Sequence, residues 1–276
     1  MTLFDEFQIL LTAVLGCTIS SVTFPVIMVV YFCRSLRASI ELVLVGGLLM
    51  ADAVLAVANA GSGIERMVSY NRGTENATLP VSECYFSPYV FMFAFCYQSI
   101  GLMTLAVSLE RFFAVFYPFL YVRYKRSQGY AIIIAVVIFS AGTYTAAIPL
   151  HINVQTHVSA FCFATTTLNP VFMKCLRLLR FTTVTISVII YIPIVYRVYH
   201  VSFTSLAALF FVLVPDAIIV FDLFGLKQFH VLSYSINLFK GIFNLAVYST
   251  KHKALRDTLK YTFCCWKPNR LGSWVT

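Results

Sequence analysis

The chain has 276 residues, of which 60% are hydrophobic and only 11% are charged, and its mean hydropathy is +0.84. A soluble domain usually carries about 25% charged residues, so this composition excludes an ordinary water-soluble protein or enzyme. The formal net charge of +9 does not predict nucleic-acid binding, because the basic residues border apolar segments, as they do in membrane proteins. We therefore expect a protein embedded in the lipid bilayer, with no nucleic-acid partner.

Seven apolar segments follow one another along the chain. At about 1.5 Å per residue, a helix of roughly 20 residues crosses a hydrocarbon core of about 30 Å. The sequence therefore predicts an all-α membrane protein, with a seven-transmembrane helix bundle in residues 1–250 and a cytoplasmic tail in residues 251–276. The expected spans are 7–32, 42–62, 86–113, 129–150, 175–199, 203–224 and 229–250.

Lysine and arginine residues are unevenly divided between the two sides of these segments. With the amino terminus outside, thirteen of the 20 fall on the cytoplasmic side and six on the outer side, as the positive-inside rule requires. The sequon that begins at Asn76 then lies in an outer loop, where it is a candidate for glycosylation. Because Asp5 and Glu6 precede the first segment where a signal peptide would be basic, we expect a retained anchor and a multi-pass protein of the cell membrane.

The third segment ends in an acid–arginine pair, Glu110 and Arg111, with Pro118 soon after. Such a pair is also compatible with a simple interfacial ion pair that reaches the lipid headgroups. Further motifs accompany it. The second segment contains the run LLMAD, which ends at Asp52, and the seventh contains the run NLAVY, from Asn244 to Tyr248. The fifth and sixth segments each contain one proline, Pro193 and Pro215. A proline lacks the backbone N–H and so permits a kink in a helix.

Together these motifs resemble the signatures of rhodopsin-like (class A) G-protein-coupled receptors, and the ERF form with the later FYP is most similar to nematode serpentine chemoreceptors of the Srsx type. The resemblance implies a chemosensory receptor that binds an extracellular small molecule or peptide and activates a heterotrimeric G protein. It also implies roles in activation for Glu110, Arg111, Asn244 and Tyr248. In the family, the acid holds the arginine at rest and the arginine turns toward the G protein on activation.

Eight cysteines are present, and a disulfide is reasonable only on the oxidising outer side. The resemblance implies a bridge between Cys84, just before the third segment, and Cys162 in the second outer loop. Cys175 is the rival partner.

The tail contains an amphipathic stretch in which Leu255, Leu259 and Phe263 recur every four residues beside basic residues. This spacing predicts a short helix that lies on the membrane surface, and it resembles the eighth helix of the family. Cys264 and Cys265 then resemble palmitoylation sites. The alternative is a pair of unmodified thiols.

Phe93 and Tyr97 share a face of the third segment with Arg111 and lie about 20 Å outward of it. The resemblance places a ligand pocket there, to which Asp216 and Tyr234 are expected to contribute. The family's amine receptors carry an aspartate near Phe93, and its absence argues against an ordinary amine. The alternative for the two aromatic side chains is plain helix packing.

Lys240 falls near the middle of the seventh segment, where an unpaired ammonium is costly. Because Lys240, Asn244 and Tyr248 share one helix face, we expect Lys240 to form an intramembrane ion pair with Asp52. The alternative is that Lys240 faces a wet cavity or stays neutral. No motif predicts a metal ion, another cofactor or a catalytic site.

Only 22 positions separate Pro193 from Pro215, so almost nothing remains for a third inner loop. Either a segment is missing from the chain as given, or the protein is receptor-like with impaired or no G-protein coupling. A transporter or channel is a further alternative, but the repeated halves and charge-lined pores of those classes are not visible.

Overall fold

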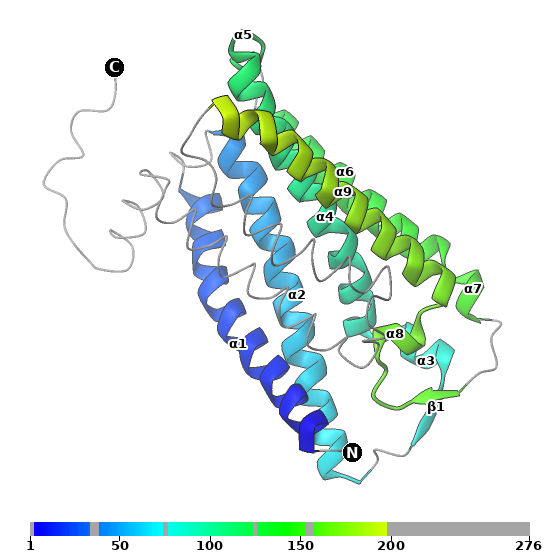
Figure 1. Cartoon of the computed structure of the whole chain (residues 1–276). Coiled ribbons are helices and arrows are strands. Elements are labelled where there is room, and N and C mark those ends of the chain that lie inside the picture. The colour runs from blue at the N-terminus through cyan, green and yellow to red at the C-terminus, as the bar shows by residue number, and fades with distance from the viewer. Residues whose placement is uncertain (1–2, 34–38, 74–76, 124–125, 153–156, 198–276) are drawn as a thin grey trace, which may run out of the picture.

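The computed structural model describes residues 3–33, 39–73, 77–123, 126–152 and 157–197. Its main elements are five long helices, which run side by side as a bundle (Figure 1). They are α1 (Leu3–Phe32), α2 (Ile40–Asn71), α4 (Pro88–Phe116), α6 (Arg126–Ala146) and α9 (Pro170–Arg197). Each is long and apolar enough to cross a membrane, so the first five expected spans are confirmed. The sixth and seventh spans and the amphipathic tail lie outside the described residues.

Short elements join these helices. They are β1 (Thr78–Pro80), α3 (Val81–Tyr85), α5 (Pro118–Tyr121), α7 (Pro149–Ile152), β2 (His157–Ser159) and α8 (Ala164–Thr167). The strands pair antiparallel, with Thr78 opposite Ser159 and Pro80 opposite His157. All except α5 lie at one end of the bundle, close to the start of α1, and α5 lies at the other end (Figure 1). We call these ends the disulfide end and the Arg111 end.

The helix boundaries differ from the expected spans by several residues, most of all in α2 and α9. Helix α2 continues to Asn71, nine residues beyond the expected end at Ser62, and α9 begins at Pro170, five residues before the expected start. Proline at the first helical position lacks only an N–H that would have no intrahelical partner, which explains the starts of α4, α5 and α9. Hydropathy marks the lipid-buried part of a helix and not its polar extensions, such as the exposed Glu65 in α2.

Helix α4 is the centre of the described bundle and packs against α2, α6 and α9. Helix α1 packs along α2 through small residues, because a side chain at Gly16 would meet the backbone of Ala56 and Ala60 within 3.0 Å. In a bilayer, the burial of apolar surface contributes little to helix association, and small residues allow the close packing that stabilises it instead.

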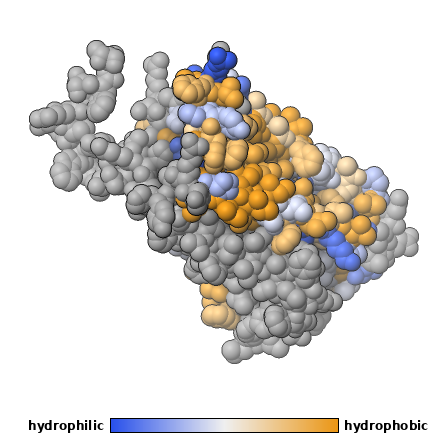
Figure 2. Space-filling view, turned by 45° about the horizontal axis from the view of Figure 1, so that its top comes forward, coloured by the Kyte–Doolittle hydropathy of each residue, from blue (hydrophilic) through white to orange (hydrophobic). Residues whose placement is uncertain are grey.

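Large apolar side chains also cover the outside of the bundle. Figure 2 shows them over the described surface between more hydrophilic patches. On α6, Ile134, Ile138 and Phe139 are exposed. In water such a surface would aggregate, whereas in a bilayer it faces lipid, so the packing agrees with the composition.

At the disulfide end, aromatic side chains tie the end of α6 to the short elements. The hydroxyl of Tyr85 donates to the Tyr144 carbonyl at 2.7 Å, the Tyr144 hydroxyl donates to the Tyr85 carbonyl, and the two rings stack. Burial raises the pKa of Tyr85 to about 12, so its hydroxyl remains a donor at neutral pH. Buried His151 accepts from the Asn169 backbone N–H at 2.7 Å and joins α7 to the start of α9.

Candidate functional site

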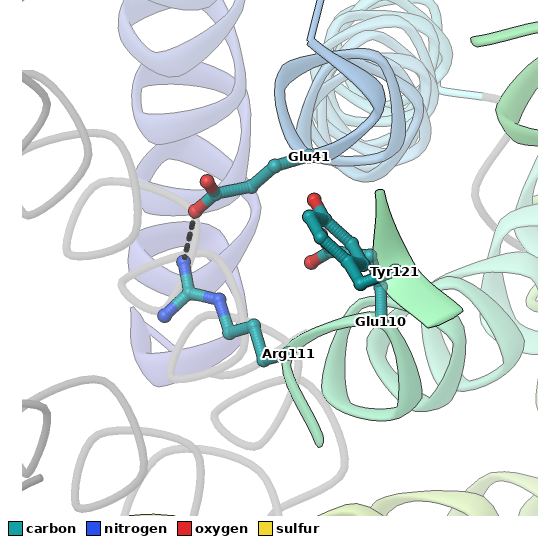
Figure 3. Close-up of polar contacts among 4 residues, drawn as sticks. All are labelled: Glu41, Glu110, Arg111 and Tyr121. Atoms are coloured by element: carbon teal, nitrogen blue, oxygen red, sulfur yellow. Dashed lines mark hydrogen bonds and ion pairs between the residues drawn. The ribbon is translucent and has the colours of Figure 1, made fainter. Parts of the chain in front are cut away.

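The Arg111 end carries an ion pair between two helices. The last turns of α4 present Arg111, and the first turn of α2 presents Glu41, where a carboxylate is favoured by the helix dipole. The Arg111 Nη2 and Glu41 Oε1 atoms are 3.3 Å apart (Figure 3). The side chains are only 17% and 28% exposed, so water screens the pair less than it would a surface pair.

Glu110, the neighbouring residue, is buried and takes a different partner. The hydroxyl of Tyr121, at the end of α5, donates to Glu110 Oε1. Burial and the Glu110 carboxylate both raise the pKa of Tyr121, so its hydroxyl stays protonated and keeps donating. The contact fixes α5 against α4 beside the Arg111–Glu41 pair (Figure 3).

The resemblance implies that Glu110 holds Arg111 at rest, and this role stays a prediction. The structure adds a second acid beside Arg111, because Glu41 makes an ion pair with it. Glu41 lies 70 positions earlier in the chain, and no local pattern links it to Arg111. Asn244 and Tyr248, the other expected activation residues, lie outside the described residues.

Asp52 lies in the middle of α2 and is only 6% exposed. Leu49 and Ala53, close to it in α2, belong to the apolar core that α2 shares with α1 and α4. Its expected partner, Lys240, lies outside the described residues, so the ion pair remains a prediction.

A charge cycle tests that pair. We expect Lys240→Met and Asp52→Asn each to lower surface delivery, because an unpaired charge in mid-membrane costs about 2.5–3.5 kcal/mol even on the lenient insertion scale. The double variant should recover much of the loss. Surface labelling of intact cells is the measurement, and Lys174→Met, on an exposed part of α9, is the control. A double variant as poor as the sum of the single losses contradicts the pair.

Phe93 and Tyr97 lie one turn apart on α4, and their stacked rings have centroids 5.9 Å apart. Their role in a ligand pocket stays a prediction. The structure adds Arg180, which the sequence analysis did not single out as a site residue. It lies inside α9 and is only 1% exposed, with its Cζ over the Tyr97 ring at 4.3 Å from the centroid. The sequence signal for it was weak, because Lys174 and Arg177 precede it in the same segment. Asp216 and Tyr234 lie outside the described residues.

The disulfide between Cys84 and Cys162 is present, with Cα atoms 5.2 Å apart, and the rival Cys175 is a free, exposed thiol. The pairing implied by the resemblance is therefore confirmed. Beside it, Arg66 at the end of α2 donates from Nε to the Phe161 carbonyl at 3.3 Å and lies over the Phe163 ring. The strand pair, the bridge and Arg66 hold the two connecting segments over this end of the bundle. The expected glycosylation residue Asn76 and the expected palmitoylation residues Cys264 and Cys265 lie outside the described residues.

Comparison with known proteins agrees with this arrangement. The family described as the serpentine type seven-transmembrane G-protein-coupled chemoreceptor Srsx matches residues 13–213, which is well over half of the chain. No curated protein matches this chain. The matched range contains the residues of the disulfide, of the Arg111–Glu41 pair and of the Phe93–Tyr97 stack, and the family is one of chemoreceptors. The chain belongs to the Srsx family of serpentine seven-transmembrane chemoreceptors.

Proposed function

We propose that this chain is a rhodopsin-like chemosensory receptor that binds an extracellular small molecule and activates a heterotrimeric G protein through Arg111. The observation that carries the proposal is the ion pair between Arg111 and Glu41, at the opposite end of the bundle from the disulfide. Disulfides persist in oxidising compartments, which favours an outward-facing disulfide end. Arg111 then faces the cytoplasm, where a G protein is available.

In this proposal the Arg111–Glu41 pair holds the resting state. Ligand bound toward the disulfide end favours a second arrangement of the helices, in which Arg111 leaves Glu41 and contacts the G protein. A ligand shifts such an equilibrium only by binding the two states unequally. The Arg111–Glu41 pair would form only in the resting state. It would therefore stabilise that state until ligand binding favours the second arrangement.

The remaining expectations complete the proposal. Helices six and seven would supply the activation residues Asn244 and Tyr248, and the amphipathic tail would be anchored by palmitoylation of Cys264 and Cys265. Asn76 would be glycosylated outside the cell, and the carboxyl terminus would lie in the cytoplasm.

A second candidate is a receptor-like protein that does not couple to a G protein. The short separation between Pro193 and Pro215 favours it, because the inner ends of helices five and six are part of the family's G-protein cavity.

Expression of the full chain with a promiscuous G protein distinguishes these functions. We expect second-messenger production without added ligand to exceed that of cells given the G protein alone. Solute uptake, measured in the same cells, should equal that of untransfected cells. Surface labelling must show the chain at the cell surface. Normal delivery with no signal supports the non-coupling candidate, and solute uptake with no signal supports a transporter.

A further inference from the structure

Arg180 and Tyr97 face each other at the same depth in the bundle. Helices α4 and α9 both begin at the disulfide end, at Pro88 and Pro170. Tyr97 is nine residues and Arg180 ten residues into its helix, which places both about 14–15 Å from that end. The contact therefore lies well inside the span, where a charged side chain is a functional candidate by default.

A close approach of the two helices holds this contact in place. A Cβ atom at Gly101 would lie 2.6 Å from the Thr183 hydroxyl oxygen and 3.3 Å from the Arg180 Cα. The Arg180 backbone thus sits opposite Gly101, and its side chain extends one turn outward to Tyr97, in the direction that helical side chains take.

Polar groups continue around α4 at this level. Gln98 is fully buried, and its side-chain oxygen accepts from the Thr143 hydroxyl at 2.7 Å. Its amide nitrogen finds no hydrogen-bond partner among the described residues. A buried donor of this kind is uncommon in a packed protein and calls for an explanation. Phe93, stacked on Tyr97, adds an aromatic surface one turn further out.

We infer that Arg180 and Tyr97 recognise the carboxylate of a small organic acid, so that the ligand of this receptor is an anion with an apolar body. The inference rests on the proposed receptor function and names its ligand class. The planar guanidinium carries its N–H donors at its rim, which suits two-point binding of a carboxylate, while its face lies on the tyrosine ring. Phe93 offers a surface for the apolar body.

The test uses pairs of acids and amides of equal size on the purified full-length receptor. The probes are hexanoate with hexanamide and phenylacetate with phenylacetamide, and the measurement is the thermal unfolding midpoint. We expect at least one acid to raise the midpoint by about 5 °C at saturation, and its uncharged amide to leave the midpoint unchanged.

Variants assign the effect to this contact. Arg180→Gln should weaken the affinity for the acid about 30-fold or more, and Arg180→Lys, which keeps the charge but loses the fork, about tenfold. Arg177→Gln, one turn away and only partly buried, is the charge control. Gly101→Ala should weaken the affinity by separating the helices, whereas Gly142→Ala, where an added Cβ would meet nothing within 4 Å, should not. If Arg180→Gln does not fold, the acid affinities of Arg180→Lys and Gly101→Ala test the inference.

Three outcomes overturn the inference. They are a midpoint that no acid raises, an amide that acts as well as its acid, and an acid effect that survives in Arg180→Lys, Gly101→Ala and any folded Arg180→Gln. An internal ion pair between Arg180 and Asp216 is the alternative. It would be shown if no acid stabilises the parent receptor and the Arg180→Gln, Asp216→Asn double variant is more stable than either single variant. The assay contains no G protein. An acid that stabilises the receptor without producing signal therefore contradicts only the proposed function, and a signal that amides evoke equally well contradicts only this inference.

Discussion

Replacing Arg111 with alanine should reduce signalling to the level of cells without the receptor, while surface delivery stays close to wild type. The reason is that Arg111 is the side chain through which we propose contact with the G protein, while its ion pair with Glu41 contributes little to the fold. The pair is partly buried but keeps some access to water, so its loss should cost on the order of 1 kcal/mol, which the fold should tolerate. Second-messenger production per receptor at the surface is the measurement.

The matched control is Arg123→Ala, an exposed arginine in the connection after α5. It removes the same charge from the same end of the bundle and should leave signalling unchanged. Equal loss in both variants would show a general effect of positive charge near the membrane. Full signalling by Arg111→Ala at normal delivery would remove the receptor mechanism proposed here.

Replacing Glu41, the partner of Arg111, should raise signalling instead of lowering it. Glu41→Gln removes the acid that holds Arg111 at rest, so ligand-independent signalling should rise about fivefold if the pair contributes about 1 kcal/mol to the resting state alone. Glu65→Gln, on an exposed position of the same helix, is the control. The double variant Glu41→Gln, Arg111→Ala should be silent. No rise in Glu41→Gln would mean that the ion pair is equally present in both states.

Loss of the disulfide is the second change with a large expected effect. Cys84→Ser or Cys162→Ser should cost up to about 5 kcal/mol and lower surface delivery strongly. The bridge closes a loop between residues 78 positions apart, and it fixes α3 to the strand pair that lies over this end of the bundle. Because the reduced chain keeps its helices in the bilayer, the entropic part is smaller than in a soluble protein.

The double variant separates a shared bond from two independent effects. If Cys84 and Cys162 act only as partners, replacing both should be no worse than replacing either one. Cys175→Ser, which removes a free and exposed thiol, should deliver normally. Additive losses would show that each cysteine has a further role of its own.

The sequence alone determined the spanning helices, because a bilayer about 30 Å thick imposes a length on every apolar segment and a helix is the local way to satisfy its backbone. The five described spans fall where hydropathy places them. Position only placed the candidate cysteines on the oxidising side, and the resemblance then selected Cys84 and Cys162 over Cys175, as the structure confirms. The polar extension of α2 and the three-residue strands escaped prediction, because hydropathy does not mark them.

Only the tertiary structure decided which side chains meet across helices. Arg111 pairs with Glu41, and Arg180 lies on Tyr97, because the packing of α4 against α2 and α9 sets depth and rotation together. The close approach at Gly101 fixes the second contact. Sequence periodicity gives the face on which a residue lies but not the residue opposite it. That partner depends on the relative height of two helices that are far apart in the chain.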